Sequence, residues 1–163
     1  MATLWEHVGN VFDSDCTVIM HQANCFGVMG AGIAAQVKRD YYPAFEADLA
    51  FPESIGSRSR LGRYSYAWVD GKHRVIFNLY GQHRYGRQGK YTEEGKLKEA
   101  LRGALRKLSD HRASGRRLDF RIKIGIPMFI GCGLAGGDWS VVEPMLQECA
   151  DEFDFDIHLY RLN

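Results

Sequence analysis

The chain has 163 residues, of which 45% are hydrophobic and 25% charged, with a net charge of +1. This ordinary globular composition excludes a disordered, collagen-like or coiled-coil protein. No apolar run reaches the ~18 residues of a membrane span, and the first residues lack the basic and apolar regions of a secretory signal. We therefore expect one domain over residues 1–163, monomeric, cytoplasmic and without membrane contact.

The four cysteines, Cys16, Cys25, Cys132 and Cys149, lie far apart and form no CxxC pair. Such spacing argues against a structural zinc site. We expect reduced thiols, no metal and no cofactor. The 18 glycines make up about 11% of the 163 residues, against a usual share of about 7%. They also cluster, which favours binding loops built from backbone groups.

Positive charge is concentrated in one segment. Residues 58–123 hold 18 of the 21 Lys and Arg but only 6 of the 20 Asp and Glu, which gives +12 there and −11 elsewhere. This asymmetry indicates an anionic partner, such as a nucleic acid or a phosphorylated ligand. The alternative is a solvated basic helix face whose charge the acidic flanks compensate in three dimensions.

The first part of the chain predicts a strand, a glycine-rich loop and two short helices. Residues 17–20 are apolar and β-branched, as expected of a buried strand. The glycine-rich loop covers residues 24–32. Helical spacing over residues 33–42 stops before Pro43, because proline disfavours helix in the preceding residue. A second short helix is expected over residues 43–51.

Residues 64–69 and 74–79 predict the two strands of a hairpin. Asp70 and Gly71 lie between them and predict a tight turn, because such turns favour residues with positive φ. A polar loop with three glycines follows over residues 80–90.

A longer helix is expected from residue 92 to about residue 111. Thr92 is its predicted N-cap, and Glu93 and Glu94 would interact favourably with the helix dipole in the first turn. Its leucines fall on one apolar face at helical spacing.

The last part of the chain again predicts a strand, a glycine-rich loop, a helix and a strand. Residues 120–126 alternate as a strand, and the loop that follows is richest in glycine over residues 130–137. Asp138 is expected to cap a helix that runs to about residue 153. A closing strand is predicted over residues 155–162.

This order of elements predicts an α/β sandwich, in which a mixed sheet is covered by helices on both faces. Ligands of such folds bind at the carboxyl ends of the strands. Both glycine-rich loops follow a strand and precede a helix, so both are expected there.

Each loop offers backbone N–H groups just ahead of a helix N-terminus, which is a ready anion site. Two facing loops suit a pyrophosphate; each loop alone is also compatible with a simple tight turn. Neither loop is a Walker A sequence, and Gly27, Gly30 and Gly32 have the spacing GxxGxG instead of the dinucleotide pattern GxGxxG.

The two loops closely resemble the phosphate loops of macrodomains. Residues 21–34 read HQANCFGVMGAGIA and residues 126–139 read IPMFIGCGLAGGDW, and Gly9-Asn10-Val11-Phe12 matches a Gly-Asp-apolar-apolar pattern of the family. The branch it looks most like contains the terminal ADP-ribose glycohydrolase, the antitoxins that reverse DNA ADP-ribosylation and the ADP-ribose-1″-phosphate phosphatases. The resemblance covers essentially the whole chain. It implies a three-layer α/β/α sandwich with a mixed central sheet, and ADP-ribose bound across the strand ends.

The resemblance also implies roles for individual residues. Asn10 lies where most members have an aspartate that accepts from adenine, and Asn24 lies near the distal ribose. For both, a plain turn residue is the alternative. The other expected ligand-binding residues belong to the loops or to the 9–12 motif: Val11, Gly30, Ala31, Gly32, Ile33, Gly131, Cys132, Gly133, Leu134, Ala135, Gly136 and Gly137.

Three residues are candidates for catalysis. Asp138 follows the second loop, but the glycohydrolases carry their aspartate three places earlier, where this chain has Ala135. A carboxylate at Asp138 would activate water or stabilise the charge at C1″ of the ribose; an N-cap is the alternative. His21 matches a histidine implicated in the phosphatase-like members, and a structural histidine is the alternative. His83 lies near the position at which the glycohydrolases carry a catalytic lysine. No lysine of this chain matches that position, and Lys90 would reach it only if the loop were displaced.

Three functions follow from the resemblance. The first is hydrolysis of an ADP-ribosyl bond on a protein or a nucleic acid, and the second is an ADP-ribose-1″-phosphate phosphatase. The third is a non-catalytic ADP-ribose reader, favoured by the missing lysine and by Ala135. The expected partner is ADP-ribose or an ADP-ribosylated macromolecule, and the basic segment 58–123 favours a nucleic acid as the carrier.

Overall fold

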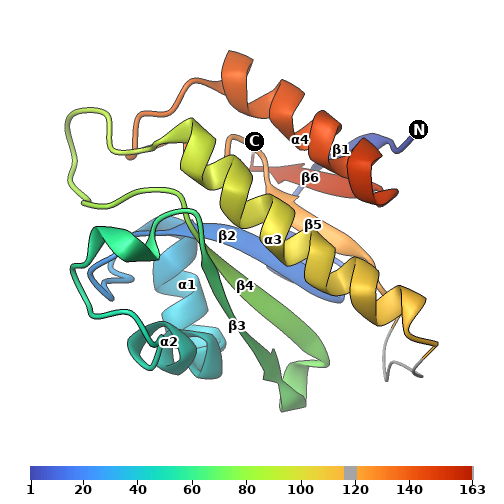
Figure 1. Ribbon diagram of the computed structural model, residues 1–163, viewed down its shortest axis with the longest axis horizontal. Helices are drawn as coiled ribbons and strands as arrows, with labels where there is room; N and C mark the ends of the chain where they lie inside the picture. Colours follow the sequence, from blue (N-terminus) through green and yellow to red (C-terminus); the bar gives the residue numbers. More distant parts are fainter. Residues whose placement is uncertain (116–120, 163) are drawn as a thin grey trace.

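The computed structural model describes residues 1–115 and 121–162 and contains a six-stranded sheet (Figure 1). The strand order is β1-β6-β5-β2-β4-β3, and every neighbouring pair is parallel except β3 and β4. The strands are β1 (Leu4–Val8), β2 (Val18–Ala23), β3 (Tyr64–Val69), β4 (Arg74–Tyr80), β5 (Ile124–Pro127) and β6 (Ile157–Arg161). The sheet is therefore mixed, as the sequence predicts.

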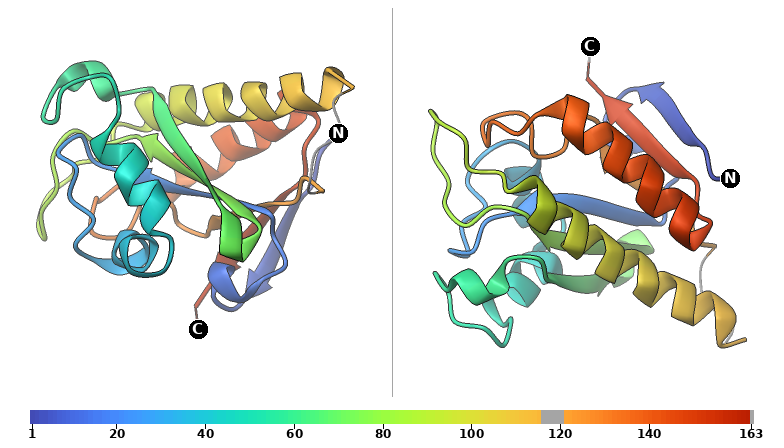
Figure 2. Two further views of the ribbon diagram at one scale, coloured as in Figure 1. Left: turned by 90° about the horizontal axis from the view of Figure 1, so that it is seen from below. Right: turned by 45° about the horizontal axis from the view of Figure 1, so that its top comes forward.

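Helices cover both faces of this sheet. They are α1 (Gly32–Asp40), α2 (Tyr42–Leu49), α3 (Glu94–Ala113) and α4 (Trp139–Phe153). Figure 2 shows α3 and α4 on one face and α1 and α2 on the other. The predicted three-layer α/β/α sandwich is confirmed.

The alternation of side chains along β2 explains the two layers. Val18 and Met20 belong to the apolar cluster beneath α3 and α4, whereas Ile19 belongs to the cluster beneath α1 and α2. A strand that is buried on both faces needs a continuous apolar run instead of an alternating one. This is why residues 17–20 are recognisable as a central strand.

One strand and several boundaries differ from the prediction. The sequence gives no sign of β1, because two of its residues are half-buried and three are exposed. Backbone pairing with β6, more than 150 residues away, holds it in the sheet. β2 continues three residues past the predicted end, so His21 and Gln22 lie within the strand.

The predicted hairpin forms, but the prediction for its turn is wrong. Residues 70–72 form a 3-10 turn, and the residue with left-handed backbone is His73, with φ of 54°. Gly71 does not have positive φ. The turn therefore does not use the conformational freedom of its glycine.

The predicted N-cap of α3 is also wrong. The capping position is Glu93, and no side chain there accepts a bond from the first turn. The Thr92 hydroxyl instead donates to the carbonyl oxygen of Gly131 at 2.6 Å. A residue that looks like a local cap is thus a contact to the second glycine-rich loop.

The strand predicted over residues 120–126 is observed as Ile124–Pro127, and Phe120 lies outside the described residues. The closing strand is also shorter than predicted, and Phe155 packs in the core instead. The predicted cap of α4 is confirmed: the Asp138 carboxylate accepts from the backbone N–H of Ser140 at 2.9 Å.

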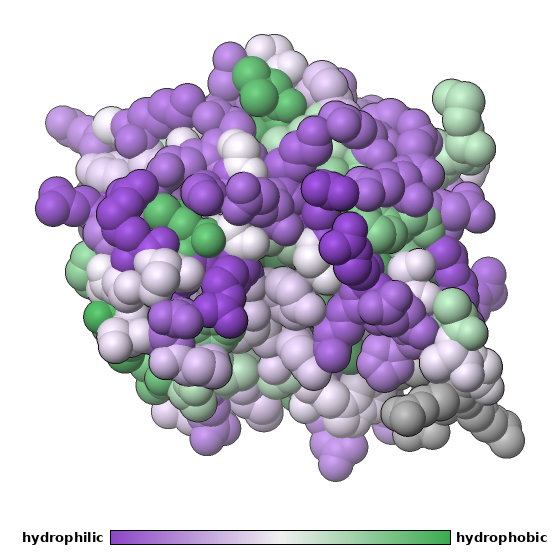
Figure 3. Space-filling view, in the orientation of Figure 1, coloured by the Kyte–Doolittle hydropathy of each residue, from purple (hydrophilic) through white to green (hydrophobic). Residues whose placement is uncertain are grey.

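Ion pairs to the acidic flanks neutralise part of the basic segment. Lys98 and Arg102 of α3 pair with Glu148 and Glu152 of α4 at 2.8 and 2.7 Å. Arg60, Arg63 and Lys123 pair with Asp48, Glu53 and Asp15. Figure 3 shows hydrophilic side chains over most of the α3–α4 face. None of the helices in the described part of the chain is long and apolar enough to cross a membrane.

Candidate functional site

The two glycine-rich loops lie at the same edge of the sheet. They follow β2 and β5, which are adjacent and parallel, so their carboxyl ends meet there (Figure 1). β1 ends at this edge too, because it continues the parallel order through β6. Asn10 and Val11, which follow β1, are thus placed on the same side of the sheet as the loops.

The first loop presents unpaired backbone donors. The backbone N–H groups of residues 30–33 donate to no acceptor among the described residues, and the N-cap residue of α1, Ala31, supplies no side-chain bond. Gly30, Ala31 and Gly32 are exposed, whereas Ile33 is half-buried. These groups form an uncapped helix N-terminus, where the helix dipole favours an anion.

Asn24 shapes this loop from inside. Its side-chain oxygen accepts from the backbone N–H of Phe26 at 2.9 Å, and its amide nitrogen donates to the carbonyl oxygen of Val28 at 2.8 Å. The side chain is buried. This is the turn-forming alternative, and its role at the distal ribose stays a prediction.

The second loop is closed by its own backbone. The N–H of Gly137 donates to the carbonyl oxygen of Gly131 at 2.8 Å, and the N–H of Gly136 donates to Gly133 at 3.0 Å. Within the described chain, the N–H groups of residues 133–135 have no acceptor. Gly133 and Leu134 are exposed, Cys132 is half-buried and Ala135 is buried. This loop too has donors left for a ligand.

Phe129 enters the second loop with a left-handed backbone, at φ of 65°. This conformation is uncommon for a bulky residue, and backbone strain of this kind clusters at functional sites. The ring is 45% exposed and packs edge-on against Trp139 at 5.1 Å. A partly exposed aromatic side chain thus lies at the start of the second loop.

Residues 81–93 form hydrogen bonds to both glycine-rich loops and so connect them. This connection could not be predicted from the sequence. The carbonyl oxygen of His83 accepts from Cys25 in the first loop at 3.0 Å. The N–H groups of Tyr91 and Thr92 both donate to the carbonyl oxygen of Ala135 in the second loop, at 2.7 and 3.0 Å. Local patterns carry no signal for these contacts, which join residues more than 40 positions apart.

Gln22 and Gly136 also belong to this junction. The Gln22 amide donates to the Thr92 hydroxyl at 2.9 Å and to Gln82 at 2.7 Å. Gly136 has φ of 72°, and a Cβ there would lie 2.6 Å from the carbonyl oxygen of Gly89. Only glycine allows the second loop to approach segment 81–93 so closely.

Asp138 is exposed beside the second loop and ionised. Ser140 donates to its carboxylate from the hydroxyl at 2.7 Å and from the backbone, which lowers the pKa of this carboxyl group. Its own N–H donates to Glu94, which pairs with Lys90 at 2.9 Å. Lys90 therefore lies near the site, although its ammonium group is held by Glu94.

His21 is buried and neutral. Its Nε2 lies 2.6 Å from the side-chain oxygen of Asn78. The amide nitrogen of Asn78 donates to the carbonyl oxygen of Ala44 and to the Ser65 hydroxyl. The Asn78 oxygen is therefore the acceptor for His21, and Nε2 of His21 carries the proton. Burial lowers the pKa of His21 to about 4. The environment is that of a structural histidine, and its catalytic role stays a prediction.

His83 and Asn10 both hold local structure. The His83 Nε2 lies 2.8 Å from the carbonyl oxygen of Gly56, and its ring packs on Phe26. The Asn10 oxygen accepts from the backbone N–H of Phe12 at 2.9 Å. Both residues lie at the carboxyl edge of the sheet, but these contacts place neither of them on a ligand.

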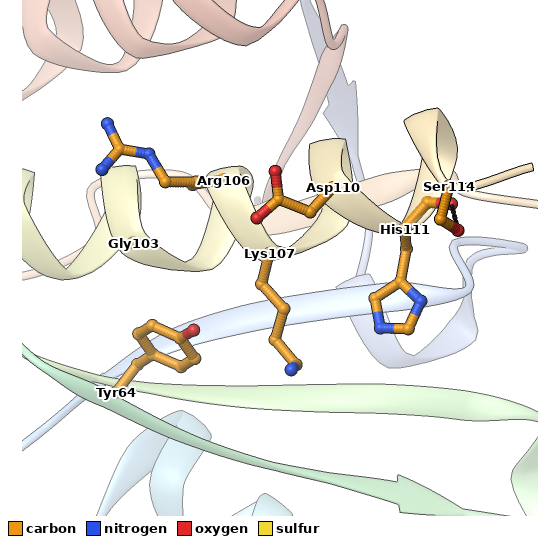
Figure 4. A pocket seen from close by; sticks show the side chains of 7 residues that line it. All are labelled: Tyr64, Gly103, Arg106, Lys107, Asp110, His111 and Ser114. Carbon is orange, nitrogen blue, oxygen red and sulfur yellow. Dashed lines mark hydrogen bonds between the residues drawn. The ribbon is translucent and has the colours of Figure 1, made fainter.

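Two cavities lie away from the loops. One, of about 480 Å³, lies between α3 and β3 (Figure 4), and the other, of about 700 Å³, lies at the opposite edge of the sheet around Thr17, Lys123 and Asp156. Within the described part of the chain, no three His, Cys, Asp or Glu side chains are placed to hold a metal ion. The open backbone donors of the two loops remain the distinctive feature of the carboxyl edge.

Comparison with known proteins identifies the fold. No family model matches the chain. A 17.5 kDa protein from the tk-vs intergenic region of Enterobacteria phage T4 is 30% identical over 141 residues, which cover 85% of this chain and 83% of the phage protein.

Solved structures agree at lower identity. The macrodomain of Mycobacterium tuberculosis DarG is 20% identical, with a TM-score of 0.76 over 98% of each chain. Thermosipho africanus DarTG, solved in complex with ADP-ribose, is 20% identical with a TM-score of 0.69, covering 98% of this chain and 42% of that one. The chain therefore has the macrodomain fold and belongs to the same family as the phage T4 protein.

Proposed function

We propose that residues 1–163 act as one domain that binds ADP-ribose at the carboxyl edge of the sheet and hydrolyses an ADP-ribosyl bond. The observation that carries the proposal is the set of unpaired backbone N–H groups on two adjacent loops, at residues 30–33 and 133–135. Two such groups of donors suit the two phosphates of a diphosphate. The structural neighbour solved with ADP-ribose supports the same ligand.

The surrounding residues suit the rest of the ligand. The partly exposed side chain of Phe129 would stack on an adenine or cover a ribose. Asn10 lies after β1, at the same edge, with a side-chain oxygen that has capacity for a second bond. The other residues of the two glycine-rich loops that the sequence predicts to bind a ligand would surround the diphosphate.

For the reaction, Asp138 is the best-placed group among the three candidates. It is exposed, ionised and adjacent to the second loop, whereas His21 is buried. A carboxylate accepts a proton from an attacking water or stabilises positive charge at C1″. Its bonds to Ser140 also favour the alternative, a non-catalytic reader in which Asp138 is only a cap.

Two measurements test the proposal. Calorimetry should show micromolar ADP-ribose binding, about −7 to −9 kcal/mol, and weaker binding of AMP, which spans only part of the site. Incubation with ADP-ribosylated protein, ADP-ribosylated DNA and ADP-ribose-1″-phosphate should then release ADP-ribose from one of the first two. Release of phosphate from the third would identify a phosphatase, and binding without any release would identify a reader. No binding at millimolar ADP-ribose would refute the proposal altogether.

A further inference from the structure

A short relay of hydrogen bonds runs from β2 to the second glycine-rich loop. The side-chain amide of Gln22 donates to the Thr92 hydroxyl at 2.9 Å, and this hydroxyl donates to the carbonyl oxygen of Gly131 at 2.6 Å. Thr92 is only 2% exposed, so water does not compete for its hydroxyl. The relay therefore connects a central strand to the loop through the interior of the protein.

The direction of each bond in this relay is fixed by its neighbours. The amide nitrogen of Gln82 donates to the carbonyl oxygen of Arg84 at 2.7 Å, so the Gln82 side-chain oxygen is left to accept from Gln22, also at 2.7 Å. Gln22 therefore presents the N–H groups of its amide, and the second of them reaches Thr92. Because the Thr92 oxygen accepts there, its single proton is directed to the carbonyl oxygen of Gly131.

The orientation of Gln22 leaves one of its own atoms without a partner. The side-chain oxygen of Gln22 is buried and accepts no hydrogen bond from the described residues. A Cβ at Gly81 or at Gly131 would lie 2.2 or 3.0 Å from this oxygen, so two glycines make room for it. An unpaired buried acceptor is destabilising and calls for an explanation. Here the opposite orientation of the amide would lose the donation to Thr92.

Thr92 holds the second loop at two points. Its hydroxyl binds the carbonyl oxygen of Gly131, and its backbone N–H binds the carbonyl oxygen of Ala135 at 3.0 Å. Four of the seven residues 131–137 are glycine, so the backbone of this loop has little conformational preference of its own. The conformation that leaves the N–H groups of residues 133–135 unpaired therefore depends on these contacts.

We propose that Thr92, oriented by Gln22, is a positioning residue for ADP-ribose: it holds the second loop in the conformation in which its unpaired N–H groups bind the diphosphate. The proposal rests on the proposed function, which supplies the ligand. Thr92 does not need to touch that ligand, because it acts through the backbone of the loop. A loop that leaves the binding conformation part of the time binds more weakly, since the apparent Kd rises as the competent fraction falls.

The test replaces the Thr92 hydroxyl and measures ADP-ribose binding by calorimetry. Thr92→Val puts a methyl group in place of the hydroxyl and should weaken binding about five- to thirty-fold, because loss of the bond to Gly131 shifts the loop away from its binding conformation. Thr92→Ser keeps the hydroxyl and should restore most of the affinity. Gln22→Met cannot donate to Thr92 and should also weaken binding, by a smaller factor; unchanged binding would overturn the role of Gln22.

Thr17→Val is the matched control at the opposite edge of the sheet. The Thr17 hydroxyl also donates to a backbone carbonyl oxygen, that of Arg121, and accepts from the N–H of Lys123 at 3.0 Å. Thermal unfolding should show that both Thr→Val variants are folded, and Thr17→Val should bind ADP-ribose as wild type does. Equal weakening by Thr17→Val would show that affinity follows general stability, and would overturn the proposal.

A second measurement follows the loop without any ligand. The N–H of Gly137 donates to the same carbonyl oxygen of Gly131 as the Thr92 hydroxyl does. Amide hydrogen exchange at Gly137 should therefore be faster in Thr92→Val than in wild type or Thr17→Val, and unchanged exchange would overturn the proposal. If wild type binds ADP-ribose and Thr92→Val binds it equally tightly, Thr92 has no positioning role and the proposed function stands. If wild type binds no ADP-ribose, the proposed function fails and this proposal fails with it.

Discussion

The burial of His21 leads to a quantitative prediction of how the free energy of unfolding changes with pH. The folded pKa is lowered to about 4 from 6.5, mainly by burial, so the folded protein holds this histidine neutral while the unfolded chain protonates it below pH 6.5. The stability that a neutral His21 contributes is therefore fully present above pH 6.5 and is lost as the pH falls toward 4. At about 1.4 kcal/mol per pKa unit, roughly 2 kcal/mol disappears between pH 7 and pH 5.

The variant His21→Gln isolates this contribution. Glutamine does not titrate, and its amide retains a donor for the side-chain oxygen of Asn78. Urea unfolding of both proteins at pH 7 and pH 5 should show that wild type loses roughly 2 kcal/mol more than the variant does. Every other titrating group is common to both proteins, so the difference belongs to His21. Equal losses would show that His21 is not held neutral in the folded state.

Three further predictions concern other contacts of the site and the core. Asp138→Asn should keep ADP-ribose affinity within a few fold and helix capping intact, but lower turnover by about 10²–10⁴; unchanged turnover would leave Asp138 as a cap only. Arg60→Met should lower the free energy of unfolding in urea by about 3–5 kcal/mol, because buried Asp48 loses the guanidinium group that lies 3.1 Å away. Adding Asp48→Asn should restore part of this stability, and a loss below about 1 kcal/mol for Arg60→Met would contradict the prediction. Thr92→Val should cost about 1–3 kcal/mol, since Gly131 and Gln22 lose their buried partner; unchanged stability would show that this junction is not structural.

The sequence predicts those parts of the fold whose signals are local. β2 and α4 are recognisable from an apolar run and from Asp138 at a helix start, and the glycine-rich loops are recognisable from composition. β1 is not, because its few buried side chains give no alternation and its stability comes from pairing with β6. Thr92 misleads for the same reason: its sequence context fits a cap, but its partner Gly131 is 39 residues away.

Charge shows the same limit of local reasoning. A net +12 over residues 58–123 predicts an anionic partner for the whole segment, but Lys98 and Arg102 are already matched by Glu148 and Glu152 of α4. Folding brings the acidic flank onto the basic helix. What remains is a smaller set of cations that only the three-dimensional arrangement distinguishes.

The most direct test of the central claim is ADP-ribose binding to three Gly→Glu variants that add the same carboxylate at different places. Gly30 and Gly133 lie in the two loops and do not have positive φ. A Cβ at either position would have no contact closer than 3.7 Å. Gly136 is unsuitable, because a Cβ there would clash with the backbone of Gly89. Gly71 is equally open, at the far end of the β3–β4 hairpin. In calorimetry, Gly30→Glu and Gly133→Glu should each weaken binding at least about 100-fold, because a like charge enters the diphosphate space. Gly71→Glu should bind as wild type does. Undiminished binding by folded Gly30→Glu and Gly133→Glu would contradict the central claim.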